Sequence, residues 1–342
     1  MLHRRIGSFS VSAPGLGCMN LSHAYGTPPS LEIAVQVLHE ALEQGIDFFD
    51  TAALYGFGAN ERLVGSVLKP YRSQIILASK CGMTGVDGKR VIDGRPETLR
   101  QSCEDSLRNL QTDVIDLYYL HRWDRKVPIE DSIGALADLV QAGKIKAIGL
   151  SEVSAETLRK AHAVHPIAAL QTEYSLWTRN PEIAVLDACR QLDVAFVAFS
   201  PLGRGFLAGR LKDPSIELEA KDIRLDMPRF QSGNFAKNLE LLDEYTRIAE
   251  ETGCSKAQLA LAWVLSRGQD IIPVFGTSKP EHVIENAACT SVHLSLSVLL
   301  RLDALINQNT VYGDRYSTAT QNEIDTETFQ ENSTHSKVME AA

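Results

Sequence analysis

The chain has 342 residues, of which 44% are hydrophobic and 23% charged, so it is neither a disordered nor a fibrous protein. Its 34 basic and 43 acidic residues leave a net charge of −9, which excludes a general attraction to nucleic acid or anionic membranes. No apolar run reaches the roughly 18 to 20 residues that a membrane-spanning helix needs. Because no secretory leader is recognised, we expect a cytoplasmic protein without nucleic-acid or membrane partners.

The cysteines are scattered, with no C-x-x-C pair and no metal-ligand spacing, at Cys18, Cys81, Cys103, Cys189, Cys254 and Cys289. They predict reduced thiols, several of them in the core. His162 and His165 form an H-x-x-H pair beside Pro166, which would suit a metal hydrolase on a barrel. No H-E-x-x-H motif or acidic ligand cluster accompanies the pair. We therefore interpret it as a solvated helix end and predict no metal.

Short β-rich runs alternate with helical patterns along most of the chain. The predicted strands are 14–18, 46–50, 75–79, 114–120, 145–150, 168–172, 194–199 and 271–275. One apolar stripe predicts a helix over 96–110, and a capping-box pattern predicts another over 255–267. Gly45, Gly143 and Gly253 stand where helices should end.

Eight strands separated by helices fit either a doubly wound sheet or a (β/α)8 barrel. Most predicted strand ends are one βα unit apart, but those near 200 and 276 are 76 residues apart. The stretch 211–238 between them is charged and nearly aperiodic, so we predict a long loop after strand seven. One α/β domain, a TIM barrel over 1–316, then needs fewer assumptions than two domains. The polar segment 317–342 is predicted to be a flexible tail.

Four chemically capable side chains follow neighbouring predicted strands: Asp50 and Tyr55 after the second, Lys80 after the third and His121 after the fourth. In a barrel these strand ends meet on one face, where active sites lie. Taken singly, each residue has an ordinary explanation, such as a turn cap, a solvated lysine or a half-buried histidine. Their common register makes coincidence a weaker explanation than a shared site.

Over residues 1 to about 315 the sequence resembles the aldo-keto reductase superfamily. The resemblance is carried by G-I-D-F-F-D-T-A-A-L-Y-G at 45–56, L-A-S-K at 77–80, the strand ending at His121, G-L-S-E at 149–152, Q-T-E-Y at 171–174, F-S-P-L-G-R-G-F-L at 199–207 and G-T-S-K-P-E-H-V-I-E-N at 276–286. It implies a (β/α)8 barrel closed at the bottom by an N-terminal hairpin, here 2–12. The sequence looks closest to the NADP-dependent branch that includes aryl-alcohol and plant alkaloid reductases.

The resemblance implies a catalytic tetrad of Asp50, Tyr55, Lys80 and His121 for NADP(H)-dependent, reversible reduction of aldehydes or ketones. Such a reduction needs a hydride from nicotinamide C4 and a proton for the nascent alkoxide. Tyr55 would supply the proton, and the Lys80 ammonium would lower its pKa from about 10 toward working pH. Asp50 would keep Lys80 charged and oriented. His121 would donate to, or orient, the substrate carbonyl oxygen.

The implied cofactor is NADPH or NADP+, with NADH as the alternative. The positions that match cofactor contacts are Met19, Asp50, Ser151, Gln171, Phe199, Ser200, Pro201, Leu202, Gly203, Arg210, Gly276, Ser278, Lys279, His282, Glu285 and Asn286. Many relatives have Asn where Glu152 stands. Many also have an arginine at the position of His282 that grips the 2′-phosphate. Lys279 and Arg210 are the alternative sources of positive charge here.

We expect an apolar and aromatic pocket for a small-molecule carbonyl or alcohol. Its predicted lining is Tyr25, Phe57, Arg122, Trp123, Tyr174 and Trp177. Arg122 would either attract an anionic substrate or pair with an acid.

Two other functions are considered. A Rossmann dehydrogenase would explain glycines at 203, 205 and 209, but that fingerprint belongs to a first βα turn, not to the seventh strand. Potassium-channel β subunits share the barrel and bind NADP as regulatory partners. They commonly have asparagine at the position of His121, so this histidine favours a reductase.

Overall fold

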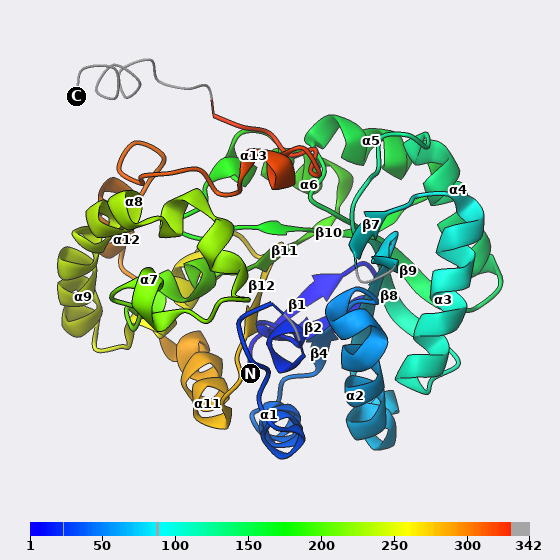
Figure 1. Ribbon diagram of the computed structural model, residues 1–342, viewed down its shortest axis with the longest axis horizontal. Helices are drawn as coiled ribbons and strands as arrows, with labels where there is room; N and C mark the ends of the chain where they lie inside the picture. Colours follow the sequence, from blue (N-terminus) through cyan, green and yellow to red (C-terminus); the bar gives the residue numbers. More distant parts are fainter. Residues whose placement is uncertain (23, 87–88, 330–342) are drawn as a thin grey trace.

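Eight parallel strands form a closed barrel in the computed structural model, which describes residues 1–22, 24–86 and 89–329. In order around the barrel, the strands are β10 (Ile167–Glu173), β11 (Ala195–Phe199), β12 (Ile271–Gly276), β3 (Gly15–Gly17), β4 (Phe48–Asp50), β5 (Ile76–Cys81), β8 (Ile115–Leu120) and β9 (Ile145–Ser151). Each corresponds to one predicted strand, so the (β/α)8 prediction is confirmed. Figure 1 shows the strands in the middle with helices around them.

The strands are largely buried and mostly apolar because a barrel strand is covered on both faces. Every residue of β8 is buried, for example. The strands pair in parallel. Lys80 of β5 lies opposite Tyr119 of β8, and Asp50 of β4 lies opposite Ala78 of β5. This register brings the carboxyl ends of β4, β5 and β8 to the same face of the barrel.

Helices pack around the barrel between the strands. They are α1 (Leu31–Glu43), α2 (Ala59–Leu68), α3 (Pro96–Leu110), α4 (Ile129–Gln141), α5 (Ala155–Val164), α6 (Val185–Leu192), α10 (Lys256–Ser266), α11 (Pro280–Ala287) and α12 (Leu296–Leu305). The two predicted helices correspond to α3 and α10, and Ser255 with Gln258 forms the expected capping box. Gly45, Gly143 and Gly253 all have positive φ at helix ends.

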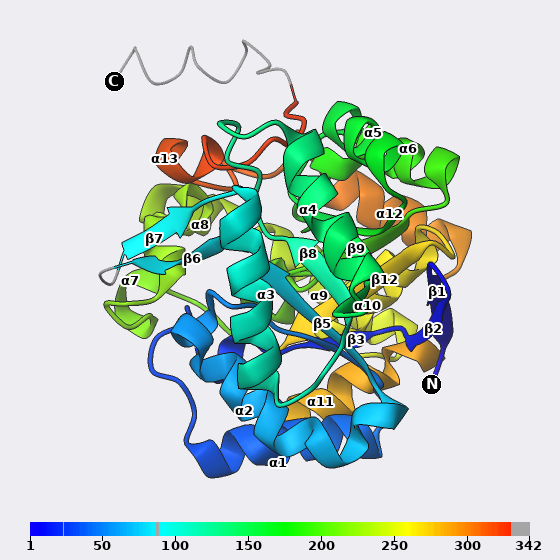
Figure 2. The same cartoon turned by 90° about the vertical axis from the view of Figure 1, so that its right-hand side faces the viewer.

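Two hairpins lie at opposite ends of the barrel (Figure 2). The first, β1 (His3–Ile6) with β2 (Phe9–Ser12), is the expected N-terminal hairpin. It lies at the amino ends of the strands, since Arg4 donates to the carbonyl of Ile271, the first residue of β12. The second, β6 (Met83–Val86) with β7 (Lys89–Ile92), follows the carboxyl end of β5 and was not predicted.

The segment between β11 and α10 corrects the prediction of a long loop over 211–238. It contains three 3₁₀ turns, the short α7 (Pro214–Glu217), α8 (Ser232–Leu239) and α9 (Leu241–Thr252). Short helices with proline in their first turn contain too few turns for apolar residues to recur at helical spacing. The sequence of this segment therefore resembled that of a loop.

Residues 317–329 lie along the barrel mouth, with a short α13 (Thr318–Gln321). Asp325 accepts hydrogen bonds from the hydroxyls of Ser154 and Thr157 at the start of α5, at 3.0 and 2.6 Å. Flexibility of 317–342 stays a prediction, and 330–342 lie outside the described residues. Within the described part, no helix has the length and apolar character needed to cross a membrane. All six cysteines are free, and five of them are buried.

Candidate active site

Asp50, Tyr55, Lys80 and His121 come together at the carboxyl ends of β4, β5 and β8. Asp50 is the last residue of β4, Lys80 is the penultimate residue of β5, and His121 follows β8. Tyr55 begins a 3₁₀ turn, Tyr55–Gly58, that returns the chain over the end of β4. The four residues are all buried, so their polar groups depend on one another for hydrogen bonds.

Lys80 is the centre of this cluster. Its fully buried ammonium pairs with Asp50 and donates to the Thr51 carbonyl at 2.9 Å and to the Tyr55 hydroxyl at 3.3 Å. An ammonium has three N–H groups, so these contacts use all of them. The other oxygen of Asp50 accepts a hydrogen bond from the Gln171 amide at 2.8 Å. The carboxylate is therefore held from two strands, and it fixes the ammonium beneath the phenol.

Burial decides how these groups titrate. It raises the pKa of Tyr55, and this outweighs the lowering effect of Lys80. For Lys80, burial alone would lower the pKa, but Asp50 and Tyr55 raise it above its ordinary value. The expected lowering of the Tyr55 pKa toward working pH is thus corrected. Asp50 offsets much of the lysine charge, and at neutral pH the cluster holds a neutral phenol above a charged ammonium.

His121 lies edge-on against the phenol ring of Tyr55, with ring centroids 5.8 Å apart and planes at 84°. Its backbone N–H donates to the Cys81 carbonyl at 2.9 Å, which extends the β5–β8 pairing by one residue. Imidazole and phenol therefore face the barrel mouth together.

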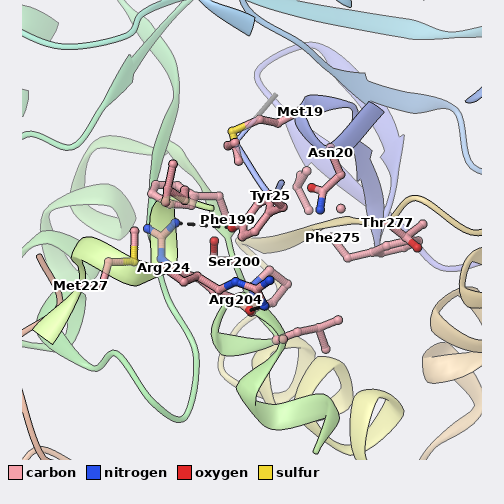
Figure 3. Close-up of a pocket in the computed structure, with 18 of the residues that line it drawn as sticks. Met19, Asn20, Tyr25, Phe199, Ser200, Arg204, Arg224, Met227, Phe275 and Thr277 are labelled. Carbon is pink, nitrogen blue, oxygen red and sulfur yellow. Dashed lines mark hydrogen bonds between the residues drawn. The ribbon is translucent and has the colours of Figure 1, made fainter. Parts of the chain in front are cut away.

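A cavity of about 740 Å³ opens above this cluster. Asp50, Tyr55 and His121 line it, together with the turn after β3, the ends of β9, β10, β11 and β12, the segment after β11 and α13. Figure 3 shows part of the lining, with Met19, Asn20 and Tyr25 on one side, Phe199 and Ser200 below, and Phe275 and Thr277 toward the far end. The cavity is large enough for a dinucleotide lying across the strand ends.

Sequence comparison identifies the family. The sequence model of the aldo/keto reductase family matches residues 15–307. This chain belongs to the aldo/keto reductase family. A relative from Glycine max, "Probable aldo-keto reductase 1", is 42% identical over 311 residues, which are 90% of this chain and 89% of that one.

Solved structures of the family have the same fold. The glycerol dehydrogenase AKR11B4 from Gluconobacter oxydans matches with a TM-score of 0.81 and 32% identity, covering 89% of this chain and 94% of that one. An aldo/keto reductase from Klebsiella pneumoniae in complex with NADP and acetate matches with a TM-score of 0.70 and 26% identity, over 92% and 97% of the chains. This aldo/keto reductase is thus an oxidoreductase, and its relatives support a nicotinamide cofactor.

Most residues predicted to bind the cofactor line the cavity of this aldo/keto reductase. They are Met19, Asp50, Ser151, Gln171, Phe199, Ser200, Pro201, Leu202, Arg210, Gly276, Ser278, His282, Glu285 and Asn286. Gly203 and Lys279 do not line it. Gly203 has a φ of 55° and lies against Trp177, so it shapes the turn after β11. Glu152 is withdrawn from the cavity, since one oxygen accepts the Glu173 N–H at 2.9 Å and the other pairs with Arg315.

The end of the cavity beside α11 has polar groups that suit the adenosine half of a dinucleotide. Arg210 contacts the His282 imidazole and donates to Glu285 at 3.1 Å. Burial and the neighbouring Arg210 charge lower the pKa of His282. The buried Asn286 side-chain oxygen has no hydrogen-bond partner among the described residues, and α11 begins at Pro280, two residues after Ser278 of the cavity lining. A helix start, an arginine and an unused amide oxygen fit a dinucleotide.

The predicted substrate lining is partly corrected. Tyr25 and Arg122 line the cavity, but Phe57, Trp123, Tyr174 and Trp177 do not. The side chain of Phe57 is half exposed and covers Gly85. The Trp123 indole donates to the Val127 carbonyl at 2.8 Å within its own loop. Tyr174 and Trp177 point into the core. The Tyr174 hydroxyl donates to the Glu182 carboxylate at 2.7 Å, and the Trp177 ring stacks on Phe206 with ring centroids 4.1 Å apart.

A buried charge network next to the cavity was missed. Arg204 lines the cavity and donates to Glu173 at 2.6 Å and to the Tyr316 hydroxyl at 2.9 Å. Arg315 pairs with both Glu152 and Glu173. The network joins strands β9 and β10 to residues more than 100 positions later. Arg204 stood inside the S-P-L-G-R-G-F-L motif, but nothing in the sequence indicated its partners.

The H-x-x-H pair has a structural explanation, because His162 accepts the Ile167 N–H at 3.2 Å at the end of α5. No group of three or more His, Cys, Asp or Glu residues in the described ranges is arranged to hold a metal.

Proposed function

We propose that this protein is an NADP(H)-dependent oxidoreductase that reversibly reduces aldehydes or ketones to alcohols. The observation that carries the proposal is the buried cluster in which Lys80 contacts Tyr55 at 3.3 Å and pairs with Asp50, at the base of a cavity with a dinucleotide-sized volume. When bound, the nicotinamide cofactor supplies and accepts hydride. The protein's own side chains donate the proton, stabilise the charge that remains and orient the substrate.

Tyr55 is the proton donor in this proposal. Its raised pKa keeps the phenol protonated at neutral pH, and its hydroxyl faces the cavity beside His121. Lys80 stabilises the phenolate that remains after the proton has moved to the developing alkoxide. Asp50 positions Lys80, and His121 orients the carbonyl oxygen for this transfer.

Three groups of side chains would hold the cofactor. Ser151, Gln171 and Phe199 would bind its nicotinamide end above the cluster, and the turn after β11 would bind the pyrophosphate. His282, Glu285 and Asn286 would bind the adenosine half. Preference for NADPH over NADH is proposed from Arg210 and His282, which are close enough to contact one phosphate together. Lys279 does not line the cavity and is a weaker candidate.

The test is NADPH oxidation with 4-nitrobenzaldehyde, followed at 340 nm, for the wild type and Tyr55→Phe. We expect turnover in the wild type and a loss of about 100-fold or more in the variant. Tight NADPH binding without turnover of any aldehyde in the wild type would contradict a reductase and favour a binding subunit of the channel-β type.

A further inference from the structure

Five arginines line the cavity, and four of them are neutralised by carboxylates. The pairs are Arg90 with Glu323, Arg204 with Glu173, Arg210 with Glu285 and Arg224 with Asp222. A guanidinium that is already paired attracts a substrate carboxylate less strongly than one without a carboxylate partner, although Arg210 keeps further N–H groups for a cofactor phosphate.

Arg122 is the exception. Its guanidinium donates only to neutral oxygens, the backbone carbonyl of His121 at 2.6 Å and the hydroxyl of Ser151 at 3.1 Å. It forms no ion pair with any carboxylate in the part of the chain that the structure describes. A guanidinium has five N–H groups, so this half-buried cation keeps donors for a further acceptor.

Arg122 also lies next to the reacting groups. It follows His121 directly at the end of β8, and both line the same cavity as Tyr55. Its charge acts on the Tyr55 phenol, where it favours the ionised form. An anionic group held by Arg122 would therefore be a short distance from a carbonyl oxygen that contacts Tyr55.

The carboxylates around the cavity do not oppose this. Asp50 is engaged by Lys80, Glu285 by Arg210 and Glu323 by Arg90. Glu217 and Asp226 also line the cavity, but they are exposed side chains on the segment after β11.

We propose that Arg122 is a specificity residue that selects carbonyl substrates carrying a carboxylate close to the aldehyde or ketone. The substrate class is thus oxo-acids and carboxylated aromatic aldehydes. This inference rests on the proposed carbonyl reduction, because it places the anion relative to Tyr55 and His121. The guanidinium binds the substrate carboxylate with charge-assisted hydrogen bonds and takes no part in the proton transfer.

The test compares 4-carboxybenzaldehyde with its neutral methyl ester in the wild type, Arg122→Met, Arg122→Lys and Lys126→Met. Lys126 is the control, since it is an exposed cation on the same loop that does not line the cavity. The measured quantity is the ratio of kcat/KM for acid over ester, in which effects common to both aldehydes cancel.

We expect this ratio to fall about tenfold in Arg122→Met, through KM of the acid, and to stay within about threefold of wild type in Arg122→Lys and in Lys126→Met. An unchanged ratio in Arg122→Met would overturn the inference. An equal loss for acid and ester would also overturn it, because Arg122 would then only hold Ser151 and the loop in place.

A binding measurement separates this inference from the proposed function. Calorimetric titration of 4-(hydroxymethyl)benzoate into NADP+-loaded protein needs no turnover. We expect a Kd about tenfold weaker in Arg122→Met than in the wild type. If no aldehyde is turned over but this difference is found, the proposed function fails and the anion site stands. Equal Kd values would overturn the site whatever the activity.

Discussion

The ammonium of Lys80 lies 3.3 Å from the hydroxyl of Tyr55, yet the pKa of Tyr55 is raised. Burial of the phenol is the larger effect, and Asp50 offsets part of the lysine charge. The pair is therefore set up to give a proton at neutral pH rather than to accept one.

Carbonyl reduction needs protonated Tyr55, and alcohol oxidation needs it ionised. Because its pKa lies above the ordinary value of about 10, we expect kcat/KM for reduction to be flat from about pH 6 to 9. Alcohol oxidation should still be rising at about pH 10. Steady-state rates in both directions at saturating cofactor check this. A decline in reduction centred below pH 8 would contradict a raised pKa.

Tyr55→Phe removes only the phenolic hydroxyl. We expect kcat/KM for reduction to fall by a factor of about 100 or more, with unchanged cofactor affinity and circular dichroism. Tyr118→Phe is the matched control, since its buried hydroxyl lies on the neighbouring strand and bonds Ser106 at 3.2 Å. Retention of a tenth or more of wild-type activity in Tyr55→Phe would remove the tyrosine from its role.

Lys80→Met removes the charge that opposes the burial effect on Tyr55. The pKa of the phenol should then rise further, so the rise of alcohol oxidation with pH should continue to higher pH in the variant than in the wild type. The pH profile of kcat/KM for oxidation in both proteins, at saturating cofactor, is the measurement. A profile that keeps its position and is only lower at every pH would indicate that Lys80 acts by position alone.

The barrel was predictable because short, mostly apolar strand segments alternate with helical patterns at the spacing of βα units. The polar cluster was predictable because Lys80 lies near the end of one such strand and His121 follows another. The Arg315–Glu152 pair was not, since it joins residues 163 positions apart. Trp177 was misplaced for a different reason. An aromatic side chain after a strand can turn into the core or into the cavity, and only packing against Phe206 decides which.

The network around Glu173 should be important for stability. Burial would raise the pKa of Glu173, but Arg204, Arg315 and Arg229 lower it. Glu173→Gln leaves buried guanidinium groups uncompensated, and we expect a loss of about 3 to 5 kcal/mol in the free energy of unfolding at pH 7.

Because the folded-state pKa is depressed, the contribution of this carboxylate is present above the unfolded pKa of about 4.3 and is lost as pH falls through the folded value. Urea titrations of wild type and Glu173→Gln at pH 7 and pH 4 measure this. The difference between them should be smaller at pH 4, and a constant difference would contradict the charge argument.

Cofactor choice should depend on the protonation of His282. Its pKa is lowered in the free protein by burial and Arg210, and a bound 2′-phosphate would oppose that shift. Binding of NADP+ then takes up a proton, so its affinity relative to NAD+ should rise as pH falls from 8 to 6. His282→Gln should abolish this trend and leave a preference due to Arg210. Equal Kd values for the two cofactors from pH 6 to 8 would refute both parts.

The segment after β11 should close over bound cofactor. Leu218, Ile223 and Met227 line the cavity, so a dinucleotide there would add contacts to a segment of short helices. Lys212 and Lys221 are exposed, whereas Arg224 pairs with Asp222 and Arg229 bonds Thr178 at 2.8 Å. Tryptic cleavage in the free protein is therefore expected after Lys212 and Lys221, not after the two arginines.

Saturating NADP+ should slow cleavage at both lysines by about tenfold or more. Proteases cut a lid segment in its open conformation, and a bound ligand that the segment closes over makes that conformation rarer. Mass spectrometry of timed digests measures each bond separately. Cleavage after Lys126, an exposed residue that does not itself line the cavity, gives the reference rate. Identical rates at Lys212 and Lys221 with and without NADP+ would show that this segment forms a fixed wall of the cavity, and that cofactor exchange is controlled elsewhere.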